Sequence, residues 1–332
     1  MDKQVRIAFL FLSILLITSV VYSKFLLSVS MFGWAILAFY SFRKPFKIWE
    51  EKGLLLTIGL IALTAFSGVN SENTGEWIHH LRMRLPFFAL PVALYMIPKP
   101  SPRTYFFIQY FLIFLIFFST LPVLYEVLVD FDTIYQGLAA GRPIPTPIQH
   151  TKYSLMVAYA IIAGALLIKD QLPHSGYIKK WLLIGVVVYL LIFLHILAVR
   201  SGLVVFYLSA VLLSAVYAFW QRSFRTLIIA LVLAILLPVI GFLSIPSLNK
   251  RVHYMIYDLK EYLKDGGDQY SDSDRINSLL VGWEIFKDHP LIGTGIGDLK
   301  DECKIKYEEK FGADKYVLYP HNQYLFVLAG SG

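Results

Sequence analysis

Three side chains in the second half of the sequence could together act on a phosphate ester. Arg200 and Arg275 carry guanidinium groups, which bind phosphate oxygens through paired hydrogen bonds. His321 supplies an imidazole, the side chain best suited to take a proton from a hydroxyl group near neutral pH. A pyrophosphate held by arginines and a hydroxyl activated by histidine is the chemistry that matches these residue types.

Each of these residues also has a simpler explanation. Arg200 could extend its charged end to the membrane interface, and His321 could merely begin a helix. Arg82 and Arg84 form a further basic cluster, which could bind the same anion or form a solvated face. Arg200 carries the most information, because it stands in the shortest connection of the chain, at a membrane boundary, where a cation usually has a partner.

Other candidates lie beside these residues. His150 is a rival to His321 as general base, whereas His195 lies in an apolar stretch and is predicted to be packed and hydrogen-bonded. The full set of candidate substrate contacts is Arg82, Arg84, His150, Tyr153, Asn322 and Tyr324.

The elements that must position these residues are membrane helices. Hydrophobic residues make up 57% of the 332 residues and charged residues only 16%, compared with about 25% charged in a soluble chain. Apolar runs of roughly 20 residues, the length needed to cross a bilayer, recur along the chain. The sequence predicts an all-α integral membrane protein, a polytopic helical bundle of about nine complete spans. The predicted spans are 5–23, 25–42, 53–69, 84–98, 104–129, 151–168, 181–199, 203–220 and 225–245.

Basic residues in the short connections predict the orientation. With a cytoplasmic N-terminus, about thirteen Lys and Arg residues fall in inner loops and about six in short outer loops. This places Arg200, Arg275 and His321 on the outer side. Three parts are expected: a bundle at 1–245, an outer domain with amphipathic helices at 246–319, and the start of a tenth span at 320–332 that is cut short.

The outer segment is predicted to contain helices at 274–288 and 298–311. Ser273 or Asp274 would cap the first helix, and Pro290 would follow its end. The glycines of 293–297 match neither a dinucleotide fingerprint nor a Walker loop, and they predict a tight turn between two helices. Cys303, the only cysteine, allows no internal disulfide. The net charge of +7 is attributed to membrane orientation and anionic lipid, so no nucleic-acid partner is expected.

The order of these motifs resembles the O-antigen ligase family, within the superfamily that also contains O-antigen polymerases. The resemblance rests on Arg200-Ser201-Gly202 between two spans and on a long outer loop. That loop carries Arg275, then Trp283, then 289–295, and His321-Asn322-Gln323-Tyr324 leads into the next span. The resemblance covers most of the second half of the chain. Family members have more spans than this chain shows.

The resemblance implies transfer of a glycan from undecaprenyl pyrophosphate to a sugar hydroxyl of lipid A-core, at the periplasmic face of the bacterial inner membrane. By position, Arg200 and Arg275 would hold the pyrophosphate and His321 would activate the acceptor. No metal or cofactor is expected, although Asp272 and Asp274 form an Asp-Ser-Asp pair. The alternatives are a polymerase of the same superfamily, a protein O-oligosaccharyltransferase, and a multispan transporter or lipid flippase.

Overall fold

The computed structural model describes residues 2–42, 51–171, 177–222, 224–265, 271–312 and 316–332. Within these ranges the chain forms fourteen α-helices and a short 3₁₀ helix, without a β-strand, which confirms the predicted all-α class. The helices are α1 (Lys3–Tyr22), α2 (Lys24–Ser41), α3 (Lys52–Phe66), η2 (Ser67–Asn70), α4 (Thr74–Met96), α5 (Pro102–Val129), α6 (Phe131–Ala139), α7 (His150–Gln171), α8 (Tyr177–Leu197), α9 (Arg200–Gln221), α10 (Arg225–Ser244), α11 (Pro246–Asp265), α12 (Ser271–Asp288), α13 (Leu299–Phe311) and α14 (Gln323–Ser331).

Eight helices in the described ranges are long and apolar enough to cross a membrane. They are α1, α2, α3 with η2, α5, α7, α8, α9 and α10. The fourth predicted span, 84–98, is the exception. Its residues belong to α4, which begins ten residues earlier and includes Glu76, two histidines and two arginines in its first half. These polar side chains lower its hydropathy, so the expectation of nine spans is reduced to eight.

The chain folds into two compact units, each of which combines segments that are distant in the sequence. Unit 1 comprises Met1–Ser30 and Lys99–Ile256, and unit 2 comprises Met31–Pro98 and Tyr257–Gly332. The division falls inside α2 and inside α11, so neither unit is a continuous stretch of chain.

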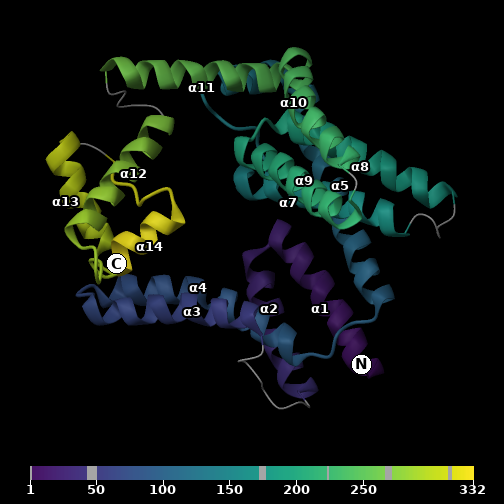
Figure 1. Ribbon diagram of the computed structural model, residues 1–332, viewed down its shortest axis with the longest axis horizontal. Helices are drawn as coiled ribbons and strands as arrows, with labels where there is room; N and C mark the ends of the chain where they lie inside the picture. Colours follow the sequence, from purple (N-terminus) through teal and green to yellow (C-terminus); the bar gives the residue numbers. More distant parts are fainter. Residues whose placement is uncertain (1, 43–50, 172–176, 223, 266–270, 313–315) are drawn as a thin grey trace. The chain divides into compact units, whose positions relative to one another are not determined.

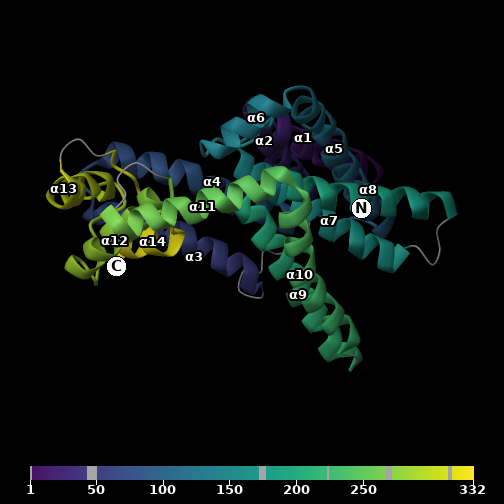
Figure 2. The ribbon, with the colours of Figure 1, turned by 90° about the horizontal axis from the view of Figure 1, so that it is seen from above.

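Unit 1 has an apolar core where α5, α7 and α8 meet. Fully buried residues at its centre include Ile113 and Ile116 of α5, Val157 of α7, and Leu190 and Leu194 of α8. Helix α9 packs against α7, and α10 packs against α9. Figure 2 shows α9 and α10 running side by side. The outer faces of these two helices are rich in exposed aliphatic and aromatic side chains, as expected for surfaces in contact with lipid.

Unit 2 combines a helical pair with a small second core. Helices α3 and α4 lie against each other, and α12 packs against both α13 and α14 (Figure 1). Val281, Ile285, Leu299 and Phe326 are buried in this second core. The predicted glycine turn is confirmed, because Gly293 and Gly295 adopt positive φ angles of 65° and 88° between α12 and α13.

The helices of the outer segment agree only in part with the predictions. The second predicted helix is confirmed as α13, and α12 ends at Asp288, two residues before Pro290. The predicted cap of the first helix is wrong, because α12 already includes Ser273 and Asp274. Ser273 is instead fully buried and donates a hydrogen bond to the carboxylate of Asp258, at 3.2 Å. Helix α11 was not predicted individually, although Leu248, Val252 and Met255 already showed helical spacing.

Candidate functional site

Arg200 is the first residue of α9, and a very short connection positions it. Helix α8 ends at Leu197, and only Ala198 and Val199 separate it from Arg200. Ala198 is almost fully buried and has a positive φ of 51°, which turns the chain sharply between the two helices. The arginine therefore stands at the N-terminus of a 22-residue helix, whose unpaired amide groups add partial positive charge to that of the guanidinium.

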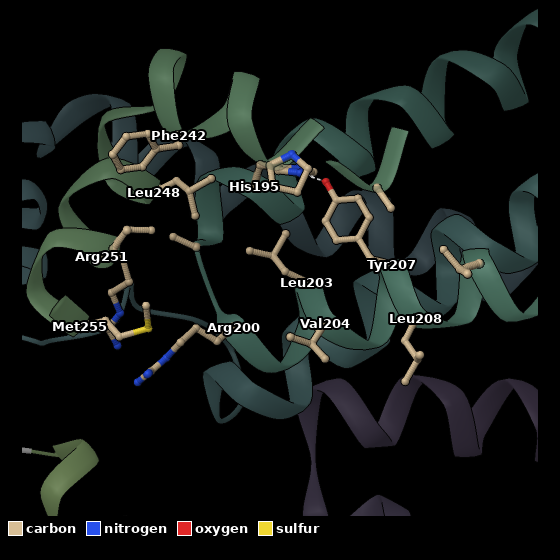
Figure 3. A pocket seen from close by; sticks show the side chains of 15 residues that line it. His195, Arg200, Leu203, Val204, Tyr207, Leu208, Phe242, Leu248, Arg251 and Met255 are labelled. Carbon is tan, nitrogen blue, oxygen red and sulfur yellow. Dashed lines mark hydrogen bonds between the residues drawn. The ribbon is translucent and has the colours of Figure 1, made fainter. Parts of the chain in front are cut away.

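Arg200 lines a pocket of about 650 Å³ in unit 1, which we call the arginine pocket. The walls come mainly from α9, α10 and α11, with His195 from α8 and Ala198 from the connection, and they are almost entirely apolar. Figure 3 shows Arg200 and Arg251 in the same part of the view, beside Met255, with His195 and Tyr207 in another part. The lining residues are His195, Ala198, Arg200, Leu203, Val204, Tyr207, Leu208, Val211, Ala234, Pro238, Phe242, Leu248, Arg251, Val252 and Met255.

His195 is packed and hydrogen-bonded, as predicted from its apolar surroundings. Its Nδ1 lies 2.7 Å from the carbonyl oxygen of Leu191, and its Nε2 lies 2.6 Å from the hydroxyl of Tyr207 (Figure 3). A carbonyl oxygen only accepts, so Nδ1 carries the proton and Nε2 accepts from Tyr207. This fixes one tautomer of a histidine that is 5% exposed. Its position in the wall of the arginine pocket was not predicted.

In unit 2, His321 lies in a segment that we call the His321 strap, residues 316–322, before α14. Its Nδ1 is 3.2 Å from the carbonyl oxygen of Tyr319 and 3.3 Å from the hydroxyl oxygen of Ser278. Because the carbonyl can only accept, Nδ1 carries the proton and Nε2 keeps a basic lone pair. His321 is exposed, so this basic nitrogen belongs to a side chain that a substrate can reach.

Ser278 connects His321 to the backbone of Arg275. The hydroxyl of Ser278 donates to the carbonyl of Arg275 at 2.7 Å and accepts from the backbone amide of His321 at 3.2 Å. Ser278 is fully buried, whereas Arg275 is exposed one turn away on the same helix. One hydroxyl group thus contacts the backbone of Arg275 as well as the backbone amide and the imidazole of His321.

The backbone of α12 closely approaches the Pro320 ring of the His321 strap. Gly282 faces Pro320, and a Cβ atom at Gly282 would lie 2.6 Å from the Pro320 ring. Any larger residue would push the strap away from the helix. Glycine at this position therefore supports the contact between Ser278 and His321, one turn earlier on α12.

The two arginines of α4 have different surroundings. Arg84 is half-buried, donates to the hydroxyl of Thr64 at 2.6 Å and lies 5.3 Å from the centre of the Phe326 ring. Arg82 is exposed. His80, on the same helix, packs edge-on against Tyr319 of the His321 strap. Burial, and then the positive charge of Arg84, lower the pKa of His80 below its usual value, which favours the neutral imidazole.

The other candidate contacts fall in varied places. His150 begins α7 and is half-buried, while Tyr324 is 83% exposed at the start of α14. Asn322 caps α14, since its side chain accepts from the amides of Tyr324 and Leu325. Tyr153 is fully buried, and its hydroxyl lies 2.9 Å from that of Ser119. This contact joins α5 to α7 and gives Tyr153 a packing role.

Neither a metal cluster nor a reactive thiol accompanies these groups in the described ranges. There, no three His, Cys, Asp or Glu side chains are arranged to hold a metal ion. The side chain of Asp272, in the Asp-Ser-Asp pair, lies outside the described part of the structure. Cys303 is fully buried, and burial raises the pKa of its thiol to about 12, so it stays protonated.

One known protein family matches part of this chain. Residues 185–332 match the family described as O-antigen ligase. This segment is thus similar to an O-antigen ligase domain. The match agrees with the family predicted from the motif order, and members of that family are glycosyltransferase-like enzymes of the O-antigen and lipopolysaccharide pathways. No curated protein and no solved structure matches the chain.

The matched segment contains every residue that lines the arginine pocket, together with Arg275, Ser278 and His321. Two residues of this segment, Ser278 and Arg251, were not predicted from the sequence as parts of a site. Ser278 gave no signal there, because a serine within an amphipathic helix is common. Arg251 could have been noticed as a cation next to the predicted end of the last complete span, but it stood among other basic residues of a long segment.

Proposed function

We propose that the protein is an O-antigen ligase, which transfers a glycan from undecaprenyl pyrophosphate to a sugar hydroxyl of lipid A-core. The reaction would take place at the periplasmic face of the inner membrane, without a metal ion. The observation that carries this proposal is the arginine pocket, because it combines apolar walls with a guanidinium group at the start of a helix.

These two features suit the two ends of a lipid-linked donor. Isoprene units are hydrocarbon, and they can leave the lipid for walls made of Leu203, Val204 and Leu208 without exposing apolar surface to water. A phosphate is favoured at the N-terminus of α9, where Arg200 adds a full charge that matches phosphate oxygens. A soluble sugar nucleotide would gain nothing from the apolar part of the pocket.

In the proposed reaction, the acceptor hydroxyl oxygen forms a bond with the anomeric carbon of the donor glycan. The bond between that carbon and the pyrophosphate oxygen breaks, and its electron pair leaves with the lipid pyrophosphate. The hydroxyl proton passes to Nε2 of His321, which the Nδ1 contact with Tyr319 leaves basic. Arg200 and Arg275 stabilise the charge that develops on the leaving pyrophosphate.

The other predicted substrate contacts fall into two groups, exposed side chains and side chains that already make packing or capping contacts. Exposed Arg82 and Tyr324 are proposed to contact the glycan acceptor, and His150 stays the rival general base. Arg84, Tyr153 and Asn322 already make packing or capping contacts, so we leave them out of the proposed reacting site.

Deleting the gene tests which transfer the protein performs. For a ligase, lipid A-core should lose all O-chain while lipid-linked polymer accumulates. A core that still carries a single repeat unit would instead identify a polymerase. Intact lipopolysaccharide combined with the loss of glycan from proteins would identify a protein O-oligosaccharyltransferase. Unchanged glycan transfer with altered lipid distribution would favour a transporter or flippase.

Transfer by the purified protein tests the chemistry. The full-length protein in nanodiscs, with lipid-linked glycan and lipid A-core, should form product at the same rate with and without a metal chelator. A rate that collapses with chelator and returns on addition of a divalent cation would overturn the metal-independent mechanism. Loss of activity in His150→Ala combined with retained activity in His321→Ala would reassign the general base.

A further inference from the structure

A second arginine, which the sequence did not single out, lines the arginine pocket. Arg251 belongs to α11 and is separated from Arg200 by 50 intervening residues and by the whole of α9 and α10. Figure 3 shows both guanidinium groups in the same part of the view, beside Met255. Apart from the two arginines, the polar residues that line this pocket are His195 and Tyr207, which form a hydrogen bond with each other.

The position of Arg251 is fixed by the turn that follows α6. Its Nη1 donates to the carbonyl oxygen of Gly141 at 2.6 Å. A carbonyl acceptor orients the guanidinium and leaves its positive charge in place, and a guanidinium has five N–H donors in a fixed plane. The contact therefore orients the guanidinium of Arg251, which also lines the pocket.

Gly141 is required for this contact for two reasons. Its φ of +79° lies in the left-handed region that side chains disfavour. A Cβ atom at Gly141 would also lie 2.7 Å from the ring of Tyr254, which sits one turn after Arg251 on α11. The turn and the helix are thus fitted closely to each other, and any side chain at position 141 would displace Arg251.

We propose that Arg251 is a second phosphate-binding arginine of the pocket, which helps Arg200 to hold the diphosphate of the lipid-linked donor. This inference rests on the proposed function. A diphosphate that links a lipid to a glycan carries two negative charges, and Arg251 adds a cation to those that Arg200 and Arg275 are proposed to supply. The apolar walls exclude water around these charges, which strengthens each guanidinium–phosphate contact.

Binding of isoprenoid phosphates to the full-length protein in nanodiscs tests this role. Undecaprenyl diphosphate is expected to bind Arg251→Ala about 10–100-fold more weakly than wild type. Undecaprenyl monophosphate should lose much less affinity, because one phosphate can still bind Arg200. Lys250→Ala is the matched control, since it removes a cation from the same turn of α11 but does not line the pocket, and it should change affinity less than about twofold.

Two further variants separate charge from orientation. Arg251→Lys keeps the charge but loses the planar pair of donors, and it should show an intermediate loss of about 3–10-fold. Gly141→Ala keeps every charged group and should weaken diphosphate binding to a similar extent. All variants are first compared by size-exclusion chromatography and thermal unfolding, so that a folding defect is recognised.

The outcomes distinguish this inference from the proposed function. If Arg200→Ala loses diphosphate binding but Arg251→Ala does not, the role of Arg251 is overturned and the proposed function stands. If both variants bind like wild type, the pocket does not hold the donor and both proposals fail. An equal loss of monophosphate and diphosphate binding in Arg251→Ala would show a general structural effect and would also overturn the inference.

Discussion

The arginine pocket of unit 1 and the His321 site of unit 2 hold their charged or basic groups in opposite ways. In the pocket, arginines stand at the edge of an apolar cavity formed by three helices. At the second site, the imidazole is exposed and is held by hydrogen bonds to a buried serine and to the carbonyl of Tyr319. The first arrangement is built by packing and the second by a hydrogen-bonded network.

This difference corresponds to two tasks. A lipid phosphate must be taken from a bilayer, so its site needs hydrocarbon contact and low water content, which strengthen ionic contacts. A general base must exchange protons with a hydroxyl and with water, so it needs access and a fixed tautomer. Substitutions in one region should therefore change donor binding, and substitutions in the other should change the rate of the chemical step.

The largest expected effect is that of His321→Ala. Loss of the base should lower kcat by about 10²–10⁴-fold. The affinity for undecaprenyl diphosphate should stay unchanged, because no pocket residue is altered. Single-turnover transfer and equilibrium binding measure the two quantities separately. Wild-type turnover in this variant would remove His321 from the mechanism.

A smaller effect, on donor binding and not on kcat, is expected from Ala234→Trp. The added side chain fills the arginine pocket from α10. The KM for lipid-linked donor should rise about tenfold with little change in kcat, because the added ring competes with isoprene units. Ala230→Trp is the control, one turn earlier on α10 and outside the pocket lining. Equal effects of both substitutions would argue against donor binding in this pocket.

Ser278→Ala tests whether the network orients His321. Loss of one hydrogen bond of about 1 kcal/mol should lower kcat about fivefold and leave the KM for donor unchanged. Selective ¹⁵N-histidine labelling should still show one His321 tautomer, because the carbonyl of Tyr319 continues to accept from Nδ1. Ser273→Ala is the matched control, another fully buried serine of α12 that bonds Asp258 instead. A wild-type kcat in Ser278→Ala would contradict the proposed role of Ser278 in orienting His321.

The smallest effect concerns stability. Arg84→Ala removes the bond to Thr64 and the contact with Phe326, and it should destabilise unit 2 by about 1–3 kcal/mol. Exposed Arg82→Ala should change stability by less than about 0.5 kcal/mol. Thermal unfolding in detergent compares the two variants. An equal loss of stability in both variants would contradict this difference and would indicate one surface cluster, as predicted from the sequence.

The sequence predicted the features that depend on local periodicity and length. It predicted the helical class, eight of the membrane helices and the helix at 298–311, because apolar runs and helical spacing report directly on how one segment contacts its surroundings. It was wrong for 84–98, where the apolar half of a longer helix looked like a complete span. The prediction of a helix cap at Ser273 or Asp274 was also wrong. Ser273 instead donates a hydrogen bond to Asp258, a residue of another helix.

By itself, then, the sequence determined that this is a helical membrane protein, and it predicted Arg200, Arg275 and His321 as candidate site residues. Only the tertiary structure decided which groups accompany them: Arg251 in the wall shared with Arg200, and Ser278 between Arg275 and His321. The reason is physical. Spacing along a chain fixes which side chains share a face of one helix, whereas contacts between helices depend on how those faces pack.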